Sequence, residues 1–430
     1  MQVIKYPERK AWEEICKRPV LDISSLEISV NNVLDEIREN GAKALKHYTS
    51  QFDKVSIDNP EVSSLEIEEA IALIPRDLKD AMLQAKQNIE KFHARQLEQT
   101  EIIETMPGVR CWRKSLPIEK VGLYIPGGTA PLFSTLLMLG IPAMLAGCKE
   151  VIVCSPPNNE EKLHPAILYA ASLTGITRVF KAGGVQAIGA MAFGTTAIPK
   201  VYKIFGPGNQ YVTCAKQLVQ KYGVAIDMPA GPSEVAVFAD ATANPVFVAA
   251  DLLSQAEHGA DSQVLLVCSS EQLIEKVIQE LSRQIKDLTR GAFASKALEN
   301  SKIVLVKDEQ QAIELLNEYA AEHLILSCKD AEQLSEKVVN AGSVFLGHYS
   351  PESVGDYASG TNHTLPTNGY ARTYSGVSVD SFVKKVTFQQ LTKEGLKNIG
   401  PTVEILAAAE GLDAHKNSVS LRLREIMANG

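Results

Sequence analysis

The alternation of short apolar runs with helical segments constrains the fold of this chain more than any other feature. From about residue 121, glycine or proline interrupts or follows each of the runs KVGLYIPGG, EVIVCSPP, RVFKAGG, KVYKIFGPG and VAIDMPAGPSEVAVFAD, and helical segments separate most of them. A second alternation begins near residue 245 and contains QVLLVCSS, KIVLV and HLILS. Strands that alternate with helices are typical of βαβ units on a parallel sheet. The sequence therefore predicts two open α/β domains in tandem.

Both ends of the chain show a different pattern, which predicts helices. Residues 1–120 place apolar side chains at helical spacing, as in NNVLDEIRENGAKALKHYTSQFD. From about residue 377, VKKVTFQQLTKEGLKNIG and VEILAAAEGLDAHKNSVSLRLREIMANG are also expected to be helical. Because this tail is too short to bury a core of its own, we expect it to pack on a neighbour such as a second subunit.

Composition and charge exclude several classes of protein. The chain is 45% apolar and 22% charged, as in an ordinary globular protein. Its net charge of −8 and the lack of an Arg-rich arm argue against nucleic acid or an anionic membrane as partners. The charged amino terminus does not resemble a signal peptide, and no apolar stretch predicts a membrane span. Since the seven cysteines form no Cys-x-x-Cys pair, we predict core thiols in a cytoplasmic protein.

The tripeptide Ala-Glu-His occurs twice, and its first copy lies in LSQAEHGADSQ at 254–264. Asn244 and Pro245 predict the start of the helix that ends there. Gln255 and His258 are three residues apart, so their side chains share one face at the end of that helix. They could offer an amide oxygen and an imidazole nitrogen to one metal ion. An exposed helix end would explain the same residues.

Two further segments supply candidate metal ligands. The polar loop 350–369 carries Asp356 and His363, and loops of this length in compact domains are usually functional. His415 lies on the edge of an apolar stripe in the tail helix. A set of two oxygen and two nitrogen ligands suits Zn²⁺ and also accepts Co²⁺ or Mn²⁺. That set would be Gln255, His258, Asp356 and His415. A turn cap at Asp356 and a partly exposed His415 are the simpler alternatives.

The second copy of the tripeptide ends a helix at 321–323 and opens the strand LILS. Glu322 beside His323 gives two proton-transfer groups with different ordinary pKa values. Such a pair suits a reaction that needs one base for water and another for an alcohol. A solvated pair at a helix end is the alternative.

Three glycine-rich segments indicate a cofactor crevice. PGGTAP (126–131), AGGVQAIGA (182–190) and FGPGNQY (205–211) each follow an apolar strand, where ligands bind in open α/β sheets. None matches the dinucleotide pattern G-x-G-x-x-G or a P-loop. The spacing alone therefore does not identify the cofactor.

Extended motifs along most of the chain resemble those of the histidinol dehydrogenase family. In chain order they are VGLYIPGGTAPLFST, AGGVQAIGAMAFGT, FGPGNQYV, DMPAGPSEV, DLLSQAEHGADSQ, AAEHL, GDYASGTNHTLPT, RTYSGVSVDSF and AEGLDAHKNSVSLR. The early ENGAKALKHYTSQFD is similar to the amino-terminal helix of that family. The resemblance implies the oxidation of L-histidinol to L-histidine through an aldehyde, in two NAD⁺-dependent steps that end histidine biosynthesis.

The resemblance also implies a role for each candidate residue. One Zn²⁺ per subunit would be bound by Gln255, His258, Asp356 and His415. His323 would be the general base on the alcohol and later on the aldehyde hydrate, and Glu322 would activate the attacking water. The substrate would contact Ser233, His363 and Glu410 in addition to His323 and the metal ligands. NAD would contact Tyr124, Gln186 and Asn209, which fall in the three glycine-rich segments.

The fold implied by the resemblance is a pair of incomplete Rossmann-like domains with small helical segments at both ends. The expected parts are an N-terminal helical segment (1–22), an α/β domain with the metal and catalytic residues (23–120 and 233–376), an NAD-binding domain (121–232) and a helical tail (377–430). The tail would support a homodimer, in which Glu410 and His415 complete the active site of the partner.

Three other functions are compatible with parts of this pattern. A metal-dependent hydrolase would act without NAD⁺ and would leave the glycine-rich segments unexplained. A non-catalytic binding protein would leave the acid–base pair without a role. A zinc- and NAD-dependent dehydrogenase of another amino alcohol would use every residue named above, and it is the main alternative.

Overall fold

The computed structural model describes residues 1–18, 23–127 and 131–428. The chain forms two compact units, of which the first comprises residues 1–96 and 118–382 and the second comprises 97–117 and 383–430. In the described residues, no helix has both the length and the apolar character needed to cross a membrane.

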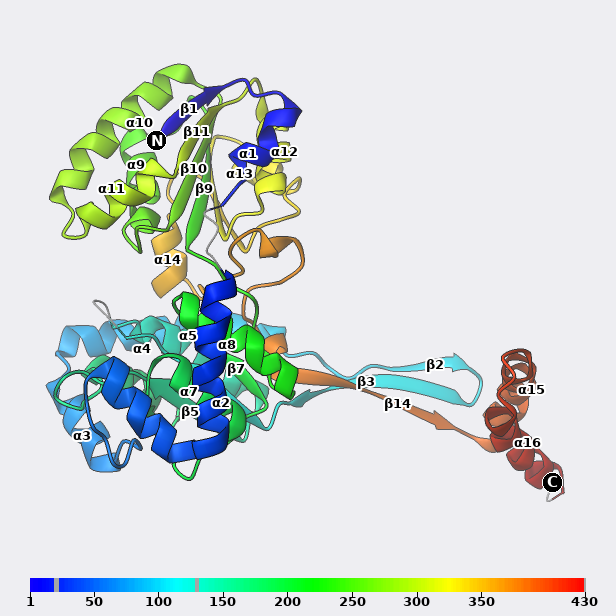
Figure 1. The fold of residues 1–430 in the computed structure, drawn as a ribbon. Coiled ribbons are helices and arrows are strands. Elements are labelled where there is room, and N and C mark those ends of the chain that lie inside the picture. The colour runs from blue at the N-terminus through cyan, green and yellow to red at the C-terminus, as the bar shows by residue number, and fades with distance from the viewer. Residues whose placement is uncertain (19–22, 128–130, 429–430) are drawn as a thin grey trace. The chain divides into compact units, whose positions relative to one another are not determined.

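A six-stranded sheet forms one layer of the first unit, in the order β1-β11-β10-β9-β12-β13 (Figure 1). Its strands are β1 (Gln2–Lys5), β9 (Glu234–Ala239), β10 (Gln263–Cys268), β11 (Lys302–Leu305), β12 (His323–Ser327) and β13 (Ser343–Leu346). All neighbouring strands are parallel. Every residue of β9, β10 and β12 is buried, because helices cover both faces of the sheet and so favour continuous apolar runs.

Helices pack on both faces of this first sheet. One face is covered by α9 (Pro245–Ala256), α10 (Glu271–Gln284) and α11 (Gly291–Glu299). The other face is covered by α1 (Trp12–Ile15), α12 (Glu309–Tyr319) and α13 (Ala331–Ser335). The short helix α14 (Glu352–Tyr357) follows β13 and begins the polar loop predicted from the sequence.

A second parallel sheet, of five strands, has the order β6-β5-β4-β7-β8. Its strands are β4 (Lys120–Tyr124), β5 (Glu150–Ser155), β6 (Arg178–Lys181), β7 (Lys203–Phe205) and β8 (Ala225–Ile226). One core holds α2 (Ile23–Tyr48), α7 (Gly184–Phe193) and α8 (Gln210–Val219) against it. A core on the other face holds α3 (Ser64–Leu73), α4 (Arg76–His93), α5 (Phe133–Ala146) and α6 (Pro165–Leu173). The two open α/β layers predicted from the alternation are therefore confirmed.

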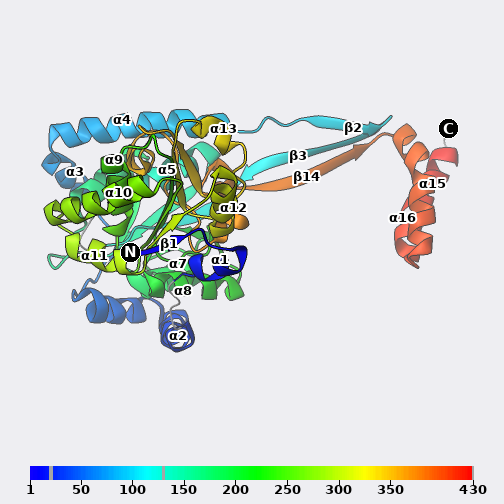
Figure 2. The same ribbon diagram turned by 90° about the horizontal axis from the view of Figure 1, so that it is seen from above.

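The second unit consists of an antiparallel sheet and two helices. The sheet has the order β14-β3-β2, with β2 (Ile102–Met106), β3 (Val109–Pro117) and β14 (Val383–Leu391). The helices α15 (Lys393–Ala409) and α16 (Asp413–Ala428) pack side by side, as Figure 2 shows. At Gly400 of α15, a Cβ atom would lie only 2.9 Å from the Leu423 side chain of α16, so the glycine permits this close packing.

The expected helical segment 1–22 is wrong at its start. Residues 2–5 form β1, which pairs with β11 at the edge of the first sheet. Only the short 3₁₀ helix Arg9–Ala11 and α1 are helical among residues 1–18. Four residues are too few for a periodic pattern, and the β-branched pair Val3 and Ile4 favours a strand.

The expected helical start of the tail is also wrong. VKKVTFQQL forms β14, which pairs with β3 along its whole length. Phe388 stacks on Trp112 across this pair, with ring centroids 5.5 Å apart. The partner strand lies far earlier in the chain, so local spacing gave no sign of the pairing.

The packing of residues 23–96 differs from the expected grouping of 23–120 with 233–376. Leu34 and Ile37 of α2 join the core of α7 and α8, and Met82 and Ile89 of α4 join the core of α5 and α6. These helices therefore cover the second sheet. Their amphipathic pattern shows which face is buried, but the sequence does not show against which sheet.

Candidate active site

Glu322 and His323 lie at the amino end of β12 and are almost fully buried. Ala320 ends α12 in the left-handed conformation, with φ of 53°, and so turns the chain directly into this pair. Glu322 Oε2 accepts hydrogen bonds from the main-chain N–H of Glu234 (3.0 Å) and from Nε2 of Gln255 (3.2 Å). The catalytic carboxylate expected from the sequence is thus fixed by β9 and by the end of α9.

His323 lies between two carboxylates. Its Nε2 is 3.1 Å from Asp356 Oδ1, and its Nδ1 is 3.7 Å from Glu322 Oε2. Burial lowers the pKa of His323, but the two carboxylates outweigh this effect and hold the pKa well above its usual value. Burial likewise opposes ionisation of Asp356, yet its bond with His323 keeps the pKa of this carboxyl below its usual range. Since an ionised carboxylate can only accept, Nε2 of His323 donates the hydrogen bond to Asp356.

Three of the expected metal ligands belong to the first unit. Gln255 is buried near the end of α9, and its Oε1 has no hydrogen-bond partner. Half-buried Asp356 lies on α14, and the nearby charge of exposed His258 lowers its pKa further. Among the described residues, no three His, Cys, Asp or Glu side chains converge as a metal site requires, and Asp356 binds His323 instead. The unpartnered amide oxygen, together with the neighbouring carboxylate and imidazole, nevertheless fits a divalent cation.

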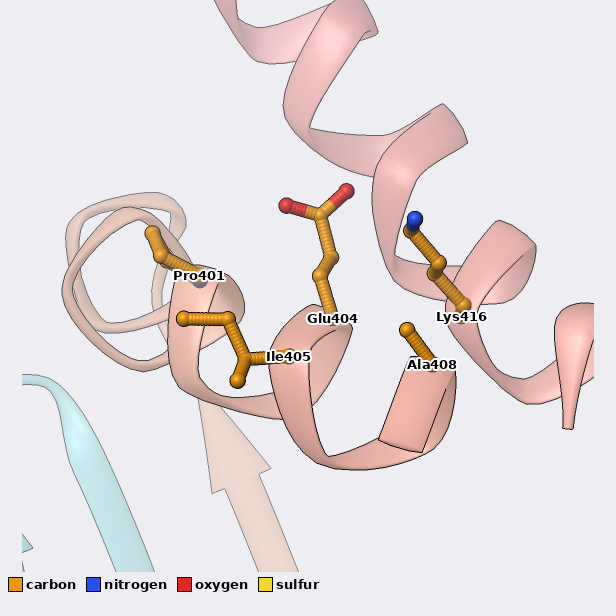
Figure 3. A pocket seen from close by; sticks show the side chains of 5 residues that line it. All are labelled: Pro401, Glu404, Ile405, Ala408 and Lys416. Carbon is orange, nitrogen blue, oxygen red and sulfur yellow. The ribbon is translucent and has the colours of Figure 1, made fainter. Parts of the chain in front are cut away.

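Glu410 and His415 belong to the second unit, where both side chains are exposed. Glu410 caps the end of α15, and His415 lies in the first turn of α16. An open hollow of about 560 Å³ lies on these two helices (Figure 3). It is lined by Pro401, Glu404, Ile405, Ala408 and Lys416. Exposure of Glu410 and His415 leaves them accessible to another chain, and their contribution in trans stays a prediction.

His363 links the loop after α14 to the layer of the second sheet. Its Nδ1 is 2.7 Å from the carbonyl oxygen of Asp356, and its Nε2 is 3.1 Å from Thr135 Oγ1 on α5. Burial lowers the pKa of His363, which favours the neutral ring. Nδ1 then donates to the carbonyl oxygen, and Nε2 accepts from the threonine. Ser233 directly precedes β9, so it lies at the same end of the first sheet as His323.

Two of the expected cofactor residues meet at the amino end of α7. Tyr124 Oη accepts a hydrogen bond from Gly184 N (3.1 Å), and burial raises the pKa of this phenol to about 12. Gln186 Nε2 donates to Asp53 Oδ2 (3.1 Å), whereas Oε1 of Gln186 is buried without a partner. Asp53 was not singled out from the sequence, because a lone acidic residue after a helix carries no spacing signal.

Asn209, the third expected cofactor residue, caps α8 by accepting from the N–H groups of Tyr211 and Val212. It lines a pocket of about 580 Å³ that also includes residues of the loops next to β9 and β10. At Gly206 a Cβ atom would lie 2.0 Å from the carbonyl oxygen of Tyr124, and φ is 122°, so only glycine fits this turn. Of the segment 126–131, residues 128–130 lie outside the described part of the chain.

Two buried acids near the site were also missed by the sequence reasoning. Glu234 forms an ion pair with Arg18 (2.9 Å), and Oε1 of Glu352 lies 2.6 Å from Oγ of Ser254, within hydrogen-bond distance. Both are about 1% exposed. A glutamate that opens a strand or a helix is usually solvated, and only the tertiary contacts reveal its burial.

Comparisons with known proteins identify the family of this chain. Residues 16–423 match the family model described as Histidinol dehydrogenase. The histidinol dehydrogenase of Bacteroides fragilis is 60% identical over 426 residues, which cover 99% of this chain and 100% of the relative. The chloroplastic histidinol dehydrogenase of Arabidopsis thaliana is 52% identical, with 97% of this chain and 90% of the relative covered.

A solved structure is also similar along nearly the whole chain. It is the histidinol dehydrogenase of Elizabethkingia anophelis, with a TM-score of 0.97, 56% identity and coverage of 99% of this chain and 98% of that one. Both the family model and these relatives extend over the two sheets and the tail. The chain therefore belongs to the histidinol dehydrogenase family.

Proposed function

We propose that this enzyme oxidises L-histidinol through L-histidinaldehyde to L-histidine, with two NAD⁺ and a zinc ion, in the last steps of histidine biosynthesis. Membership of an oxidoreductase family gives the class of reaction. The observation that carries the proposal is the buried cluster at the amino end of β12, in which His323 lies between Glu322 (3.7 Å) and Asp356 (3.1 Å).

The candidate ligands Gln255, His258 and Asp356, joined by His415 of a second subunit, would hold the zinc ion. When bound, Zn²⁺ would supply the positive charge that holds the imidazole and the amine of histidinol and so orients its carbinol carbon. The unpartnered Oε1 of Gln255 supports this assignment, since a buried amide oxygen without a donor is costly.

His323 is the proposed general base of both oxidations. It can accept the alcohol proton only in its neutral form, whereas the bond to Asp356 favours the imidazolium. Any positively charged ligand that binds Asp356 would offset its negative charge. The pKa of His323 would then fall, and the neutral imidazole could act as a base. In the second oxidation, the same nitrogen would take the proton of the aldehyde hydrate.

Glu322 is the proposed base for the water that attacks the aldehyde. Both of its hydrogen bonds fall on Oε2, which leaves Oε1 without a bond from the described residues. The free oxygen can accept a proton from water while the bonded one holds the carboxylate in place.

NAD⁺ is the proposed hydride acceptor, bound at the carboxyl ends of the second sheet. Support comes from Tyr124 and Gln186 at the amino end of α7, and from the pocket beside Asn209. Helix amino ends present N–H groups and partial positive charge, which favour the pyrophosphate of a dinucleotide. The buried and unpartnered Oε1 of Gln186 adds a candidate acceptor there.

A homodimer in the cytoplasm is the proposed working state. The helices of the second unit expose large apolar side chains, with Ile405 at 70%, Leu406 at 60% and Leu421 at 54%. Such surfaces favour contact with another chain. All seven cysteines are free thiols, as expected in a reducing compartment.

The test is NADH absorbance with L-histidinol and excess NAD⁺, on zinc-loaded and on chelator-stripped enzyme. We expect NADH from the zinc-loaded enzyme, loss after stripping and recovery when zinc returns. Other amino alcohols, offered at the same concentration, should give at least tenfold lower kcat/KM, because they lack the second zinc-binding nitrogen. Turnover of another amino alcohol but not of histidinol would replace the substrate assignment, and equal activity of the stripped enzyme would overturn the metal assignment.

A further inference from the structure

Ser254 and Glu352 form a hydrogen bond between the two helices that carry candidate metal ligands in the first unit. Ser254 lies on α9 directly before Gln255, and Glu352 begins α14 one turn before Asp356. Ser254 Oγ is 2.6 Å from Glu352 Oε1. This contact fixes the position of α14 relative to the end of α9.

The hydroxyl of Ser254 has one hydrogen but two close oxygen partners. Its Oγ is 2.8 Å from the main-chain carbonyl oxygen of Asp251 and 2.6 Å from Glu352 Oε1. A carbonyl oxygen can only accept, and serine hydroxyls in helices commonly donate to a carbonyl of the preceding turn. If Ser254 donates to Asp251, the hydrogen in the second contact belongs to Glu352. That carboxyl group must then be protonated.

The surroundings of Glu352 also favour the neutral acid. The residue is 1% exposed, and its Oε2 has no hydrogen-bond partner. No ion pair to Glu352 is present in the described part of the chain, while the carboxylates of Glu322 and Asp356 lie nearby. Burial raises the pKa of Glu352 to about 8, although the charge of His323 and a hydrogen bond donated by Ser254 act in the opposite direction. An ionised carboxylate with one bare buried oxygen would be strongly unfavourable here.

We propose that Glu352 is a positioning residue of the metal site, which as a neutral carboxylic acid donates a hydrogen bond to Ser254 and so holds Asp356 of α14 beside Gln255 of α9. The inference rests on the proposed zinc site. A neutral donor suits this position because it ties the helices together without a further negative charge beside Glu322 and Asp356. Residues that orient metal ligands typically change metal affinity by about 10–100-fold.

Zinc affinity of the full-length dimer, measured by competition with a chromophoric chelator, tests this role without reference to activity. Ser254→Ala and Glu352→Ala should each weaken zinc binding by about 10–100-fold. Glu352→Gln should stay within about threefold of the parent, because the amide is neutral, has the same shape and can still donate to Ser254. Ser282→Ala is the matched control, since this serine makes the same kind of helix back-bond, to Ile278 (2.9 Å), on an exposed face of α10.

Infrared spectroscopy of the same proteins measures the protonation state of the Glu352 carboxyl group directly. The parent should show a carboxylic-acid C=O stretching band at neutral pH that Glu352→Gln removes. Absence of this band, or zinc binding as weak in Glu352→Gln as in Glu352→Ala, would overturn the neutral-acid assignment. Unchanged zinc affinity in Ser254→Ala would overturn the positioning role. If the parent itself bound no zinc, the proposed function would fail, whereas the infrared band would still decide the state of Glu352.

Discussion

The two parallel sheets place their candidate functional residues at opposite ends of their strands. In the first sheet, Ser233 and the pair Glu322–His323 lie at the amino ends of β9 and β12. In the second sheet, Tyr124 ends β4, and Gln186 and Asn209 lie at helix starts that follow β6 and β7. Ligands of open α/β sheets usually bind at the carboxyl ends, so of the two candidate sites only that of the second sheet follows the rule.

The difference reflects what each end of a βα unit offers. Carboxyl ends lead into helix amino ends, whose N–H groups suit an anion such as a pyrophosphate. At the amino end of β9 in the first sheet, the main-chain N–H of Glu234 donates a hydrogen bond to the carboxylate of Glu322 and so holds it in place. We therefore propose that the first region serves proton transfer and the second serves cofactor binding. Substitutions in the first should change kcat, and substitutions in the second should change KM for NAD⁺.

The largest effect is expected for His323→Ala, which removes the proposed base at the amino end of β12. General-base catalysis contributes about 10²–10⁴-fold, so kcat should fall by that factor with little change in KM for NAD⁺. Steady-state NADH formation measures both constants. His348→Asn is the matched control, because His348 bonds Ser327 at the other end of the same strand (3.1 Å) and should leave kcat within about threefold. Equal losses in both variants would contradict a site confined to the amino end.

Glu322→Gln should separate the two oxidations. The alcohol step should stay within about tenfold of the parent, whereas the aldehyde step should slow by about 10²-fold or more, because it needs a base for water. Rapid mixing with histidinol, followed by assays with histidinaldehyde as substrate, gives the two rates. A similar loss in both steps would show that Glu322 serves only to position His323.

Gly206→Ala tests the proposed NAD⁺ site at the carboxyl ends of the second sheet. The added Cβ would meet the carbonyl oxygen of Tyr124 at 2.0 Å, so the turn before α8 must shift. We expect KM for NAD⁺ to rise about tenfold, with KM for histidinol unchanged. Gly223→Ala is the control, because this glycine also has positive φ (80°) but no atom within 4 Å of an added Cβ. Gly223→Ala should lower the free energy of unfolding by about 1 kcal/mol and leave KM for NAD⁺ unchanged.

The smallest effect concerns two carboxyl groups, one in each region, whose pKa values are shifted in opposite directions. Burial raises the pKa of Asp53 to about 6, whereas the bond with His323 lowers the pKa of Asp356. Between pH 4 and 6, folded Asp53 keeps a proton that the unfolded chain has lost, so its contribution to stability declines as pH rises.

Asp53→Asn should remove that decline. Relative to the parent, the variant should gain about 1 kcal/mol between pH 4 and 6, a figure reduced for the partial exposure of Asp53 to solvent. Urea unfolding at several pH values measures the difference. A constant difference across this range would show that the carboxyl group of Asp53 titrates normally in the folded chain.

The alternation of apolar runs was sufficient to predict two open parallel sheets, because local pattern and global fold agree there. It failed for β1 and β14, since each of these strands is paired with a segment distant in sequence. It also did not reveal that α2 and α4 cover the second sheet, because an amphipathic helix shows only that one face is buried.

For the site, the motifs predicted residues that the structure does bring together in part. His323 contacts both Glu322 and Asp356, and Gln255 donates a hydrogen bond to Glu322. The roles of these residues and the participation of His415 in trans stay predictions. Glu352 could not be found from the sequence, because its importance depends on burial against α9, and SPESVGD reads as an ordinary polar loop.

The number of NADH molecules formed from a limiting amount of L-histidinol tests the central claim most directly. If the amino-end site of the first sheet carries out both oxidations with cofactor bound at the second, each histidinol should yield two NADH and one histidine. One NADH per histidinol, with histidinaldehyde released as the final product, would contradict the account, because the pair Glu322–His323 would then have no second step to catalyse.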